Sequence, residues 1–178
     1  MATIVVGGCG RGVGKTALVC GLIAALPEFR WTAIKITSHR HGQPEPVWEE
    51  TQPGLGTDTA RYLAAGARRA LLLTAVPEEF AQIVPRFLQP LQEEQKNLII
   101  ESNSILRLLT PDLCLGVNGA SETESKPSFG LVMVRADALV TLAAHDGGSE
   151  GAKPLFHLAD MERISPQMLS WLRRKLCP

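Results

Sequence analysis

The chain has 178 residues, 18 basic and 18 acidic side chains and a formal net charge of zero. This length suits one domain, residues 1–178. A domain of this size can bury a core large enough to stabilise it without disulfide bonds or a structural metal ion. Because the charges balance, the protein has no overall positive potential that would attract nucleic acid or an anionic membrane. We therefore expect neither partner and look for a local binding site. Because no apolar run approaches membrane-spanning length and the first residues lack a signal-peptide pattern, we expect a cytoplasmic protein.

A short β-branched run at residues 3–6 is followed by a glycine-rich loop and then by apolar residues at helical spacing up to Pro27. This order of strand, loop and helix predicts a phosphate-binding P-loop, in which glycine backbone and the helix N-terminus cradle phosphates. Lys15 would reach the β- and γ-phosphates as a catalytic residue, and the Thr16 hydroxyl would coordinate Mg²⁺. The residues expected to bind nucleotide are Gly8, Cys9, Gly10, Arg11, Gly12, Val13, Gly14, Lys15, Thr16 and Ala17.

The loop departs from the strict pattern G-x-x-x-x-G-K-[ST], which has glycine where this chain has Cys9. Gly8 lies one residue earlier, so the loop is one residue longer. The alternative is a glycine-rich turn with an incidental lysine. Cys9 itself is either a thiol activated by the loop amides and Lys15 or a small residue that fills the loop. The four cysteines lie far apart without a C-x-x-C pair, so we expect reduced thiols.

The middle of the chain predicts alternating strands and helices. Residues 31–37 and 69–75 have strand character, and residues 38–57 form a long polar loop, which we expect to be mobile and to contact substrate or nucleotide. A helix should run over residues 58–64 with Asp58 as its N-cap and Gly66 after its end. Residues 77–95 look helical, although Pro85 and Pro90 should kink or split that helix.

Towards the C-terminus the alternation continues. We expect strands at residues 97–101 and 112–117, a polar loop at 118–128, a central strand at 138–144, an edge strand at 155–158 and a helix that opens at Ser165 and Pro166. Strands that alternate with helices indicate an α/β fold, a three-layer arrangement of a mostly parallel sheet with helices on both faces.

Three charged residues are candidates for the same site. Glu101 ends a strand, where a carboxylate can hold Mg²⁺, although it can also simply end a buried strand. Lys35 lies inside an apolar strand and either points to the phosphates as a catalytic residue or faces solvent at an edge. Asp58 can reach the magnesium as well as cap its helix. The metal ligands expected are therefore Thr16, Asp58 and Glu101.

Two polar segments flank these candidates. Ser102, Asn103 and Ser104 follow Glu101 and can orient a γ-phosphate, a water or a substrate. His39 and His41 lie two residues apart, but two histidines without a third ligand rarely hold a metal. We expect this second segment, with Arg40, to bind an anionic group instead.

With these motifs in order, the chain resembles the P-loop NTPases of the SIMIBI class, and most closely the molybdopterin-guanine dinucleotide biosynthesis protein B (MobB) family. The resemblance rests on Gly14-Lys15-Thr16, on the segment Ile34-Lys35-Ile36-Thr37-Ser38-His39, and on Asp58-Thr59-Ala60-Arg61-Tyr62 followed by Ala65-Gly66-Ala67. It implies a P-loop NTPase fold and binding of GTP, although an Asn-Lys-x-Asp guanine motif is absent from residues 140–146. The long phosphate loop and Lys35 resemble dethiobiotin synthetase instead.

These observations give three functional hypotheses. The first is Mg²⁺-dependent binding and slow hydrolysis of GTP or ATP by an accessory factor in molybdenum cofactor biosynthesis, whose partner would be a cofactor-biosynthesis protein. The second is an ATP-dependent ligase or kinase that acts on a small carboxylate, with Lys35 on the substrate. The third is a scaffold that binds nucleotide without consuming it. The oligomeric state stays open, with a homodimer as one arrangement.

Overall fold

The computed structural model describes residues 1–38, 45–119, 127–142 and 153–176. Within these ranges, eight strands form one sheet in the order β3-β4-β2-β5-β1-β6-β7-β8. Only β3 runs antiparallel to its neighbour, and the other strand pairs are parallel. The strands are β1 Thr3–Gly8, β2 Thr32–Thr37, β3 Val47–Glu50, β4 Arg69–Thr74, β5 Leu98–Glu101, β6 Leu113–Asn118, β7 Ala138–Thr141 and β8 Leu155–His157.

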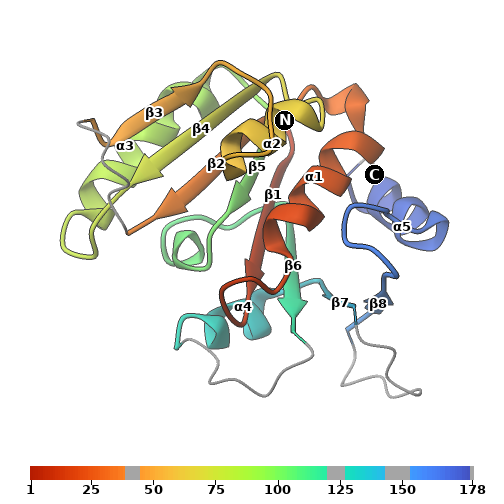
Figure 1. Ribbon diagram of the computed structural model, residues 1–178. Helices are drawn as coiled ribbons and strands as arrows, with labels where there is room; N and C mark the ends of the chain where they lie inside the picture. The colour runs from red at the N-terminus through yellow and green to blue at the C-terminus, as the bar shows by residue number, and fades with distance from the viewer. Residues whose placement is uncertain (39–44, 120–126, 143–152, 177–178) are drawn as a thin grey trace.

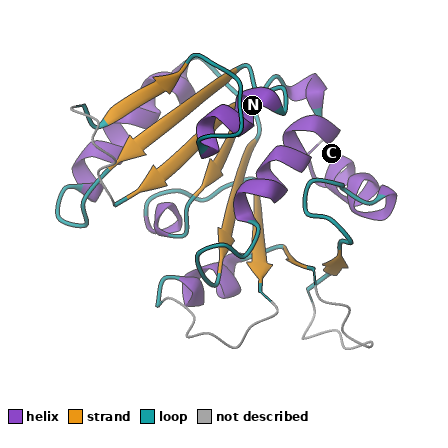
Figure 2. Ribbon diagram, in the orientation of Figure 1, coloured by secondary structure: helices purple, strands orange, loops and turns teal. Residues whose placement is uncertain are grey.

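Helices cover both faces of this sheet (Figures 1 and 2). One face packs against α1 (Lys15–Ala25), α2 (Asp58–Ala64) and α5 (Pro166–Leu176), and the other against α3 (Phe80–Glu93), α4 (Phe129–Arg135) and the 3₁₀ turn η2 (Ser104–Arg107). A second 3₁₀ turn, η1 (Pro27–Phe29), follows α1. The expected three-layer α/β fold with a mostly parallel sheet is confirmed.

Strand β1 lies between β5 and β6 and is buried along its whole length. Ile4 and Val6 pack into the core beneath α1, whereas Val5 packs into the core beneath α3 and α4. A strand covered on both faces has no polar side to present, which explains its continuous apolar sequence. Burial of each such side chain stabilises the fold by about 1.5–3 kcal/mol, and together these strands hold the loop that follows β1 in place.

The structure differs from the sequence-based expectations at several points. Residues 38–57 are not one irregular loop, because β3 forms the antiparallel edge of the sheet. The N-cap of α2 is Thr57, whose hydroxyl accepts a hydrogen bond from the Ala60 N–H at 3.0 Å, and Asp58 is the first helical residue. Helix α4 had no predicted counterpart. Strand β7 ends at Thr141 and lies next to the edge strand β8 rather than at the centre.

Other expected elements are confirmed. Gly66 follows α2 with a φ of 103°, and β8 is a short edge strand. The helix expected over residues 77–95 is present as α3, but it continues through Pro85 and Pro90, so the split that was expected as the alternative to a kink is wrong. No helix in the described ranges is long and apolar enough to cross a bilayer.

Candidate nucleotide site at the carboxyl edge of the sheet

The P-loop, residues 8–16, connects the end of β1 to the start of α1. Gly12 and Gly14 have φ angles of 75° and 99°, a conformation that residues with a Cβ rarely adopt. Gly14 is the N-cap of α1, and no side chain caps the helix there. The first amide groups of α1 and the positive end of its dipole are therefore directed at the pocket, as anion binding requires.

Asn103 anchors the start of the P-loop. Its side-chain amide accepts a hydrogen bond from the Gly8 N–H at 2.8 Å and donates to the Gly8 carbonyl at 3.0 Å. The same amide donates to the Ser128 hydroxyl at 3.2 Å. Asn103 was expected to orient a phosphate, water or substrate; the structure shows that it holds the loop backbone and also lines the pocket.

Cys9 lies beneath the loop rather than on its ligand-facing side. Its side chain is buried, and its Sγ atom accepts a hydrogen bond from the Gly119 N–H at 3.1 Å. Its own N–H donates to the Val117 carbonyl at the end of β6. This position favours the interpretation of Cys9 as a small residue that fills the loop. Cys20 and Cys114 are also buried free thiols, and burial raises their pKa values to about 11 and about 12.

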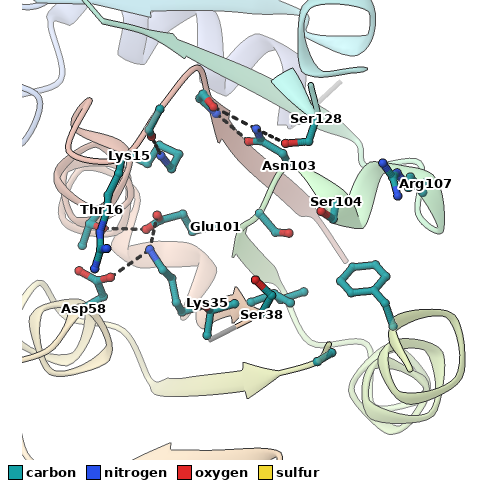
Figure 3. A pocket seen from close by; sticks show the side chains of 18 of the residues that line it. Lys15, Thr16, Lys35, Ser38, Asp58, Glu101, Asn103, Ser104, Arg107 and Ser128 are labelled. Atoms are coloured by element: carbon teal, nitrogen blue, oxygen red, sulfur yellow. Dashed lines mark hydrogen bonds and ion pairs between the residues drawn. The ribbon is translucent and has the colours of Figure 1, made fainter. Parts of the chain in front are cut away.

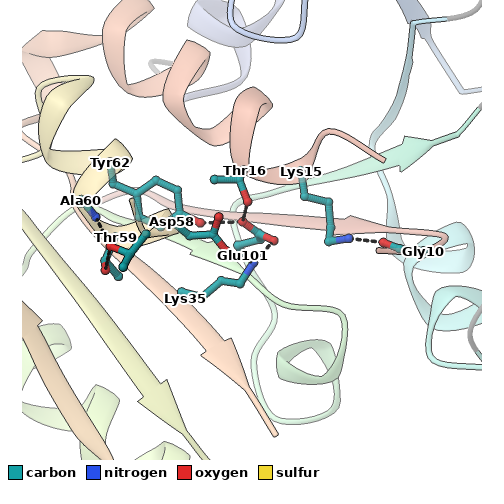
Figure 4. Close-up of polar contacts among 10 residues, drawn as sticks. Gly10, Lys15, Thr16, Lys35, Asp58, Thr59, Ala60, Tyr62 and Glu101 are labelled. Atoms are coloured by element: carbon teal, nitrogen blue, oxygen red, sulfur yellow. Dashed lines mark hydrogen bonds and ion pairs between the residues drawn. The ribbon is translucent and has the colours of Figure 1, made fainter. Parts of the chain in front are cut away.

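Glu101 is the centre of a buried polar cluster (Figure 4). Its carboxylate, 2% exposed, accepts hydrogen bonds from the Thr16 hydroxyl at 2.8 Å and from the Tyr62 hydroxyl at 2.5 Å, and it forms an ion pair with Lys35. Lys35 also pairs with Asp58 at 2.9 Å. Side chains from α1, α2 and β2 thus converge on one carboxylate at the end of β5, next to Thr16, the second residue of the helix that follows the P-loop.

The pKa shifts in this cluster follow from burial and pairing. Burial alone lowers the pKa of Lys35, but the charges and hydrogen bonds of Glu101 and Asp58 together outweigh burial, so the pKa of Lys35 is raised. Burial likewise raises the pKa of Asp58, but Lys35, with smaller contributions from Thr16 and Arg61, outweighs burial, so the pKa of Asp58 is lowered. The pKa of Tyr62 is raised well above 10 by burial and by the charge of Glu101. Lysine and tyrosine therefore remain protonated donors, and Asp58 remains charged.

Thr16, Asp58 and Glu101 suit a magnesium ion by donor chemistry. All three offer oxygen atoms, the ligands that Mg²⁺ prefers, and Mg²⁺ in nucleotide sites takes only one or two carboxylates together with phosphates and water. In the described ranges no three His, Cys, Asp or Glu residues gather as a metal cluster. The ion would therefore depend on the Thr16 hydroxyl, on the carboxylates of Asp58 and Glu101, which both contact Lys35, and on phosphate oxygens.

A single pocket of about 1020 Å³ joins the P-loop to this cluster and extends beyond both (Figure 3). Cys9 and Val13 do not line it. His39, Arg40 and His41 lie outside the described residues. The predicted site residues that line the pocket are Gly8, Gly10, Arg11, Gly12, Gly14, Lys15, Thr16, Ala17, Lys35, Asp58 and Glu101.

Lys15 and Lys35 occupy different parts of this pocket. Lys15 folds back along the P-loop, and its ammonium group donates to the Gly10 carbonyl. Lys35 belongs to β2, an interior strand between β4 and β5, so it is not an edge-facing lysine. Its ammonium group contacts both carboxylates, which makes it a counter-ion of the Glu101 cluster.

Two residues of the pocket region were missed from the sequence. Tyr62 follows Asp58 by four positions, so the two share one face of the expected helix, and that spacing predicts that both reach the same neighbours. Arg107 lines the far end of the pocket, six positions after Glu101. No sequence signal identified it, because the 3₁₀ turn that carries it was not predicted.

Compared by sequence, the chain matches no protein-family model and no curated protein. Compared by structure, it is similar to a MobB protein homolog from Bacillus stearothermophilus, with 18% identity, a TM-score of 0.51, and coverage of 99% of this chain and 98% of the other. It is similar to MobB from Bacillus subtilis, with 18% identity, a TM-score of 0.53 and the same two coverages.

The chain has the fold of MobB. It is also similar to LpxK from Aquifex aeolicus, an apo form in complex with ATP, with 19% identity and a TM-score of 0.54. That match covers 87% of this chain and 53% of LpxK. The MobB-like P-loop NTPase fold expected from the sequence motifs is confirmed at the level of architecture.

Proposed function

We propose that the protein binds a purine nucleotide with Mg²⁺, GTP in the first instance, and hydrolyses it slowly as an accessory factor in molybdenum cofactor assembly. One observation carries the proposal: the P-loop delivers Lys15 and Thr16 to the pocket beside Glu101, within a MobB fold. Phosphate binding at such a loop uses backbone amides, a lysine and a helix N-terminus. The client is expected to be a cofactor-biosynthesis protein.

The chemistry is phosphoryl transfer to water. The P-loop amides and Lys15 would stabilise negative charge on the β–γ bridge. Thr16, Asp58 and Glu101 would hold Mg²⁺, which when bound would neutralise further charge on the phosphates. Lys15 must leave the Gly10 carbonyl to reach a phosphate. Because a lysine side chain rotates readily, that exchange requires no change of fold.

Slow turnover follows from the state of the two carboxylates. Glu101 already accepts hydrogen bonds from Thr16, Lys35 and Tyr62, and Asp58 pairs with Lys35. A general base needs a carboxylate that is free to take a proton from water, and neither carboxylate is free in this way. A slow switch therefore fits this site better than a fast hydrolase.

Calorimetric titration with GTPγS and ATPγS, each with and without Mg²⁺, tests the proposal, with phosphate release from GTP and ATP measured in parallel. We expect magnesium-dependent binding of GTPγS and slow phosphate release. One structural neighbour, LpxK, was solved in complex with ATP, so ATP is the alternative nucleotide. Preference for ATPγS over GTPγS would replace GTP by ATP in the proposal. Binding of neither analogue would contradict it.

A further inference from the structure

We propose that the pocket holds a second ligand beside the nucleotide, a small organic molecule with an apolar, preferably aromatic part and one anionic group. The inference deepens the proposed function and rests on it, since it assigns the P-loop end of the pocket to the nucleotide. The cavity measures about 1020 Å³, the upper end of the range for small-molecule sites. The P-loop lines only one side of it.

The second subsite is built by two segments outside the P-loop. The first is the connection from β4 into α3, which contributes Ala75, Pro77 and Phe80. The second is η2 and the residue after it, which contribute Ser104, Arg107 and Leu108. Figure 3 shows Ser104 and Arg107 across the pocket from Thr16 and Asp58.

This subsite has an apolar wall. Phe80 is partly buried against the core beneath α3, and Leu108 exposes 42% of its surface although it is a large hydrophobic residue. Pro77 adds a rigid apolar ring to the lining. A ring or short alkyl group packed here would remove this apolar surface from water, which favours binding in proportion to the area covered.

The same subsite has a cation that is available for a ligand. Arg107 is exposed and has no hydrogen-bond or ion-pair partner among the described residues. A guanidinium group binds carboxylate or phosphate through two parallel hydrogen bonds. Lys35, by contrast, is occupied by Asp58 and Glu101. The anionic group of a second ligand therefore has its counter-charge at Arg107 rather than at Lys35.

The positions of Ser104 and Arg107, shortly after Glu101 in the sequence, place this subsite near the γ-phosphate of the nucleotide rather than near its base. A P-loop lysine contacts the β- and γ-phosphates and the following threonine holds Mg²⁺, so Lys15, Thr16 and Glu101 mark the γ end of the triphosphate. Ser104 and Arg107 lie three and six residues beyond Glu101. A ligand bound by Ser104 and Arg107 lies next to the terminal phosphate. In that position it can act as a phosphate acceptor or as an allosteric anion.

Saturation-transfer NMR and calorimetry on the protein loaded with Mg²⁺ and GTPγS test this subsite with four probes. Benzoate and phenyl phosphate combine an aromatic ring with a carboxylate or a phosphate, benzyl alcohol lacks the charge, and inorganic phosphate lacks the ring. We expect benzoate or phenyl phosphate to bind at least about tenfold more tightly than the other two, and their ranking distinguishes the two anion classes. Equal binding of all four probes, or of none, would overturn the proposal.

Arg107→Gln and Phe80→Ala should each weaken probe binding at least about tenfold. The matched control is Arg86→Gln, an exposed arginine on α3 that does not line the pocket, and it should bind the probe as the wild type does. Phe80 is partly buried, so Phe80→Ala can destabilise the fold. Arg107 is exposed, so Arg107→Gln should fold and tests the subsite in either case. Unchanged binding by Arg107→Gln would overturn the proposal.

A repeat of the titration without nucleotide separates this inference from the proposed function. Probe binding that adds to nucleotide binding supports two adjacent subsites, and displacement of GTPγS by the probe overturns them. If the probe binds but neither GTPγS nor ATPγS does, the organic-anion subsite stands and the proposed nucleotide function fails. If the nucleotide binds and no probe does, the proposed nucleotide function stands and the organic-anion subsite fails.

Discussion

Glu101 is a buried carboxylate that is stable in its charged form only because three donors surround it. An isolated charge in a protein core is unfavourable by several kcal/mol, so the hydrogen bonds from Thr16 and Tyr62 and the ion pair with Lys35 are required rather than incidental. These donors come from three different elements. The cluster therefore ties the orientation of the candidate metal ligand to the packing of α1, α2 and β2.

Tyr62→Phe removes one of these donors and changes nothing else in size or shape. Tyr62 is fully buried, so no water replaces the lost hydroxyl, and hydrogen bonds to charged groups contribute about 1.5–3 kcal/mol. We expect the free energy of unfolding in urea to fall by that amount. A change within about 0.5 kcal/mol would show that Glu101 does not depend on Tyr62.

The ion pair of Lys35 with Asp58 predicts how stability depends on pH. The pKa of Asp58 is lowered below its ordinary 3.8, so its contribution is present above that value and is lost as the pH falls through the folded-state pKa. The pKa of Lys35 is raised above 10.5, so its contribution is present below that value and is lost as the pH rises through the folded-state pKa.

Urea unfolding of wild type and Asp58→Asn across acidic pH checks this sign. The stability difference between the two proteins should be constant near neutral pH and should shrink as the pH falls below 3.8. A difference that grows towards acid would contradict the assigned ion pair. Asp58 is 40% exposed, so added salt should also reduce the difference.

At the residue scale, the sequence predicted which residues line the pocket better than it predicted their contacts. Gly14, Lys15 and Thr16 form a motif with a fixed mechanism, and a strand-ending carboxylate such as Glu101 lies where a parallel sheet places its ligands. The joint pairing of Lys35 with Asp58 and Glu101 depends on the register between β2 and β5, in which Lys35 lies opposite Glu101. Sequence pattern alone does not specify that register.

At the scale of elements, the cap of α2 provides a local test. The Thr57 hydroxyl accepts the Ala60 N–H, so Thr57→Ala should lower the free energy of unfolding by about 1 kcal/mol. Thr57→Ser keeps the oxygen and serves as the control. If Thr57→Ala matched the wild type in urea unfolding, the N-cap would lie elsewhere.

The elements that the sequence analysis missed are those with weak periodicity. Strand β3 contains Val47 and Trp48 followed by two glutamates, and its exposed side chains show no alternation that separates it from a polar loop. It is held by backbone pairing to β4 and by Glu49, whose carboxylate binds Arg69 at 2.7 Å. Helix α4 has seven residues, too few for a helical period to stand out.

The prolines of α3 show where tertiary packing overrides a local rule. Pro85 and Pro90 are both exposed, whereas Val84, Leu88 and Leu91 face the sheet. The missing N–H groups therefore lie on the solvent side, and burial of the apolar face offsets the lost helical hydrogen bonds. The expected split of the helix was wrong for this reason.

At the scale of the whole molecule, alternation of strands and helices was sufficient to predict the architecture. Parallel strands need crossover helices, and continuous apolar strands such as β1 need cover on both faces, so the pattern admits few other arrangements. The detailed strand order was not predicted, because it depends on which crossover packs on which face. This chain and the MobB protein homolog from Bacillus stearothermophilus share this architecture at only 18% sequence identity.

The central claim is that the P-loop end of the pocket binds the phosphates of a nucleotide. The most direct measurement is calorimetric titration of GTPγS with Mg²⁺ into wild type, Lys15→Ala and the control Lys96→Ala, whose lysine lies just before β5 at the opposite edge of the sheet. The account predicts that Lys15→Ala loses nucleotide affinity while keeping the wild-type circular dichroism spectrum, and that Lys96→Ala binds normally. Normal binding of the nucleotide by folded Lys15→Ala would contradict it.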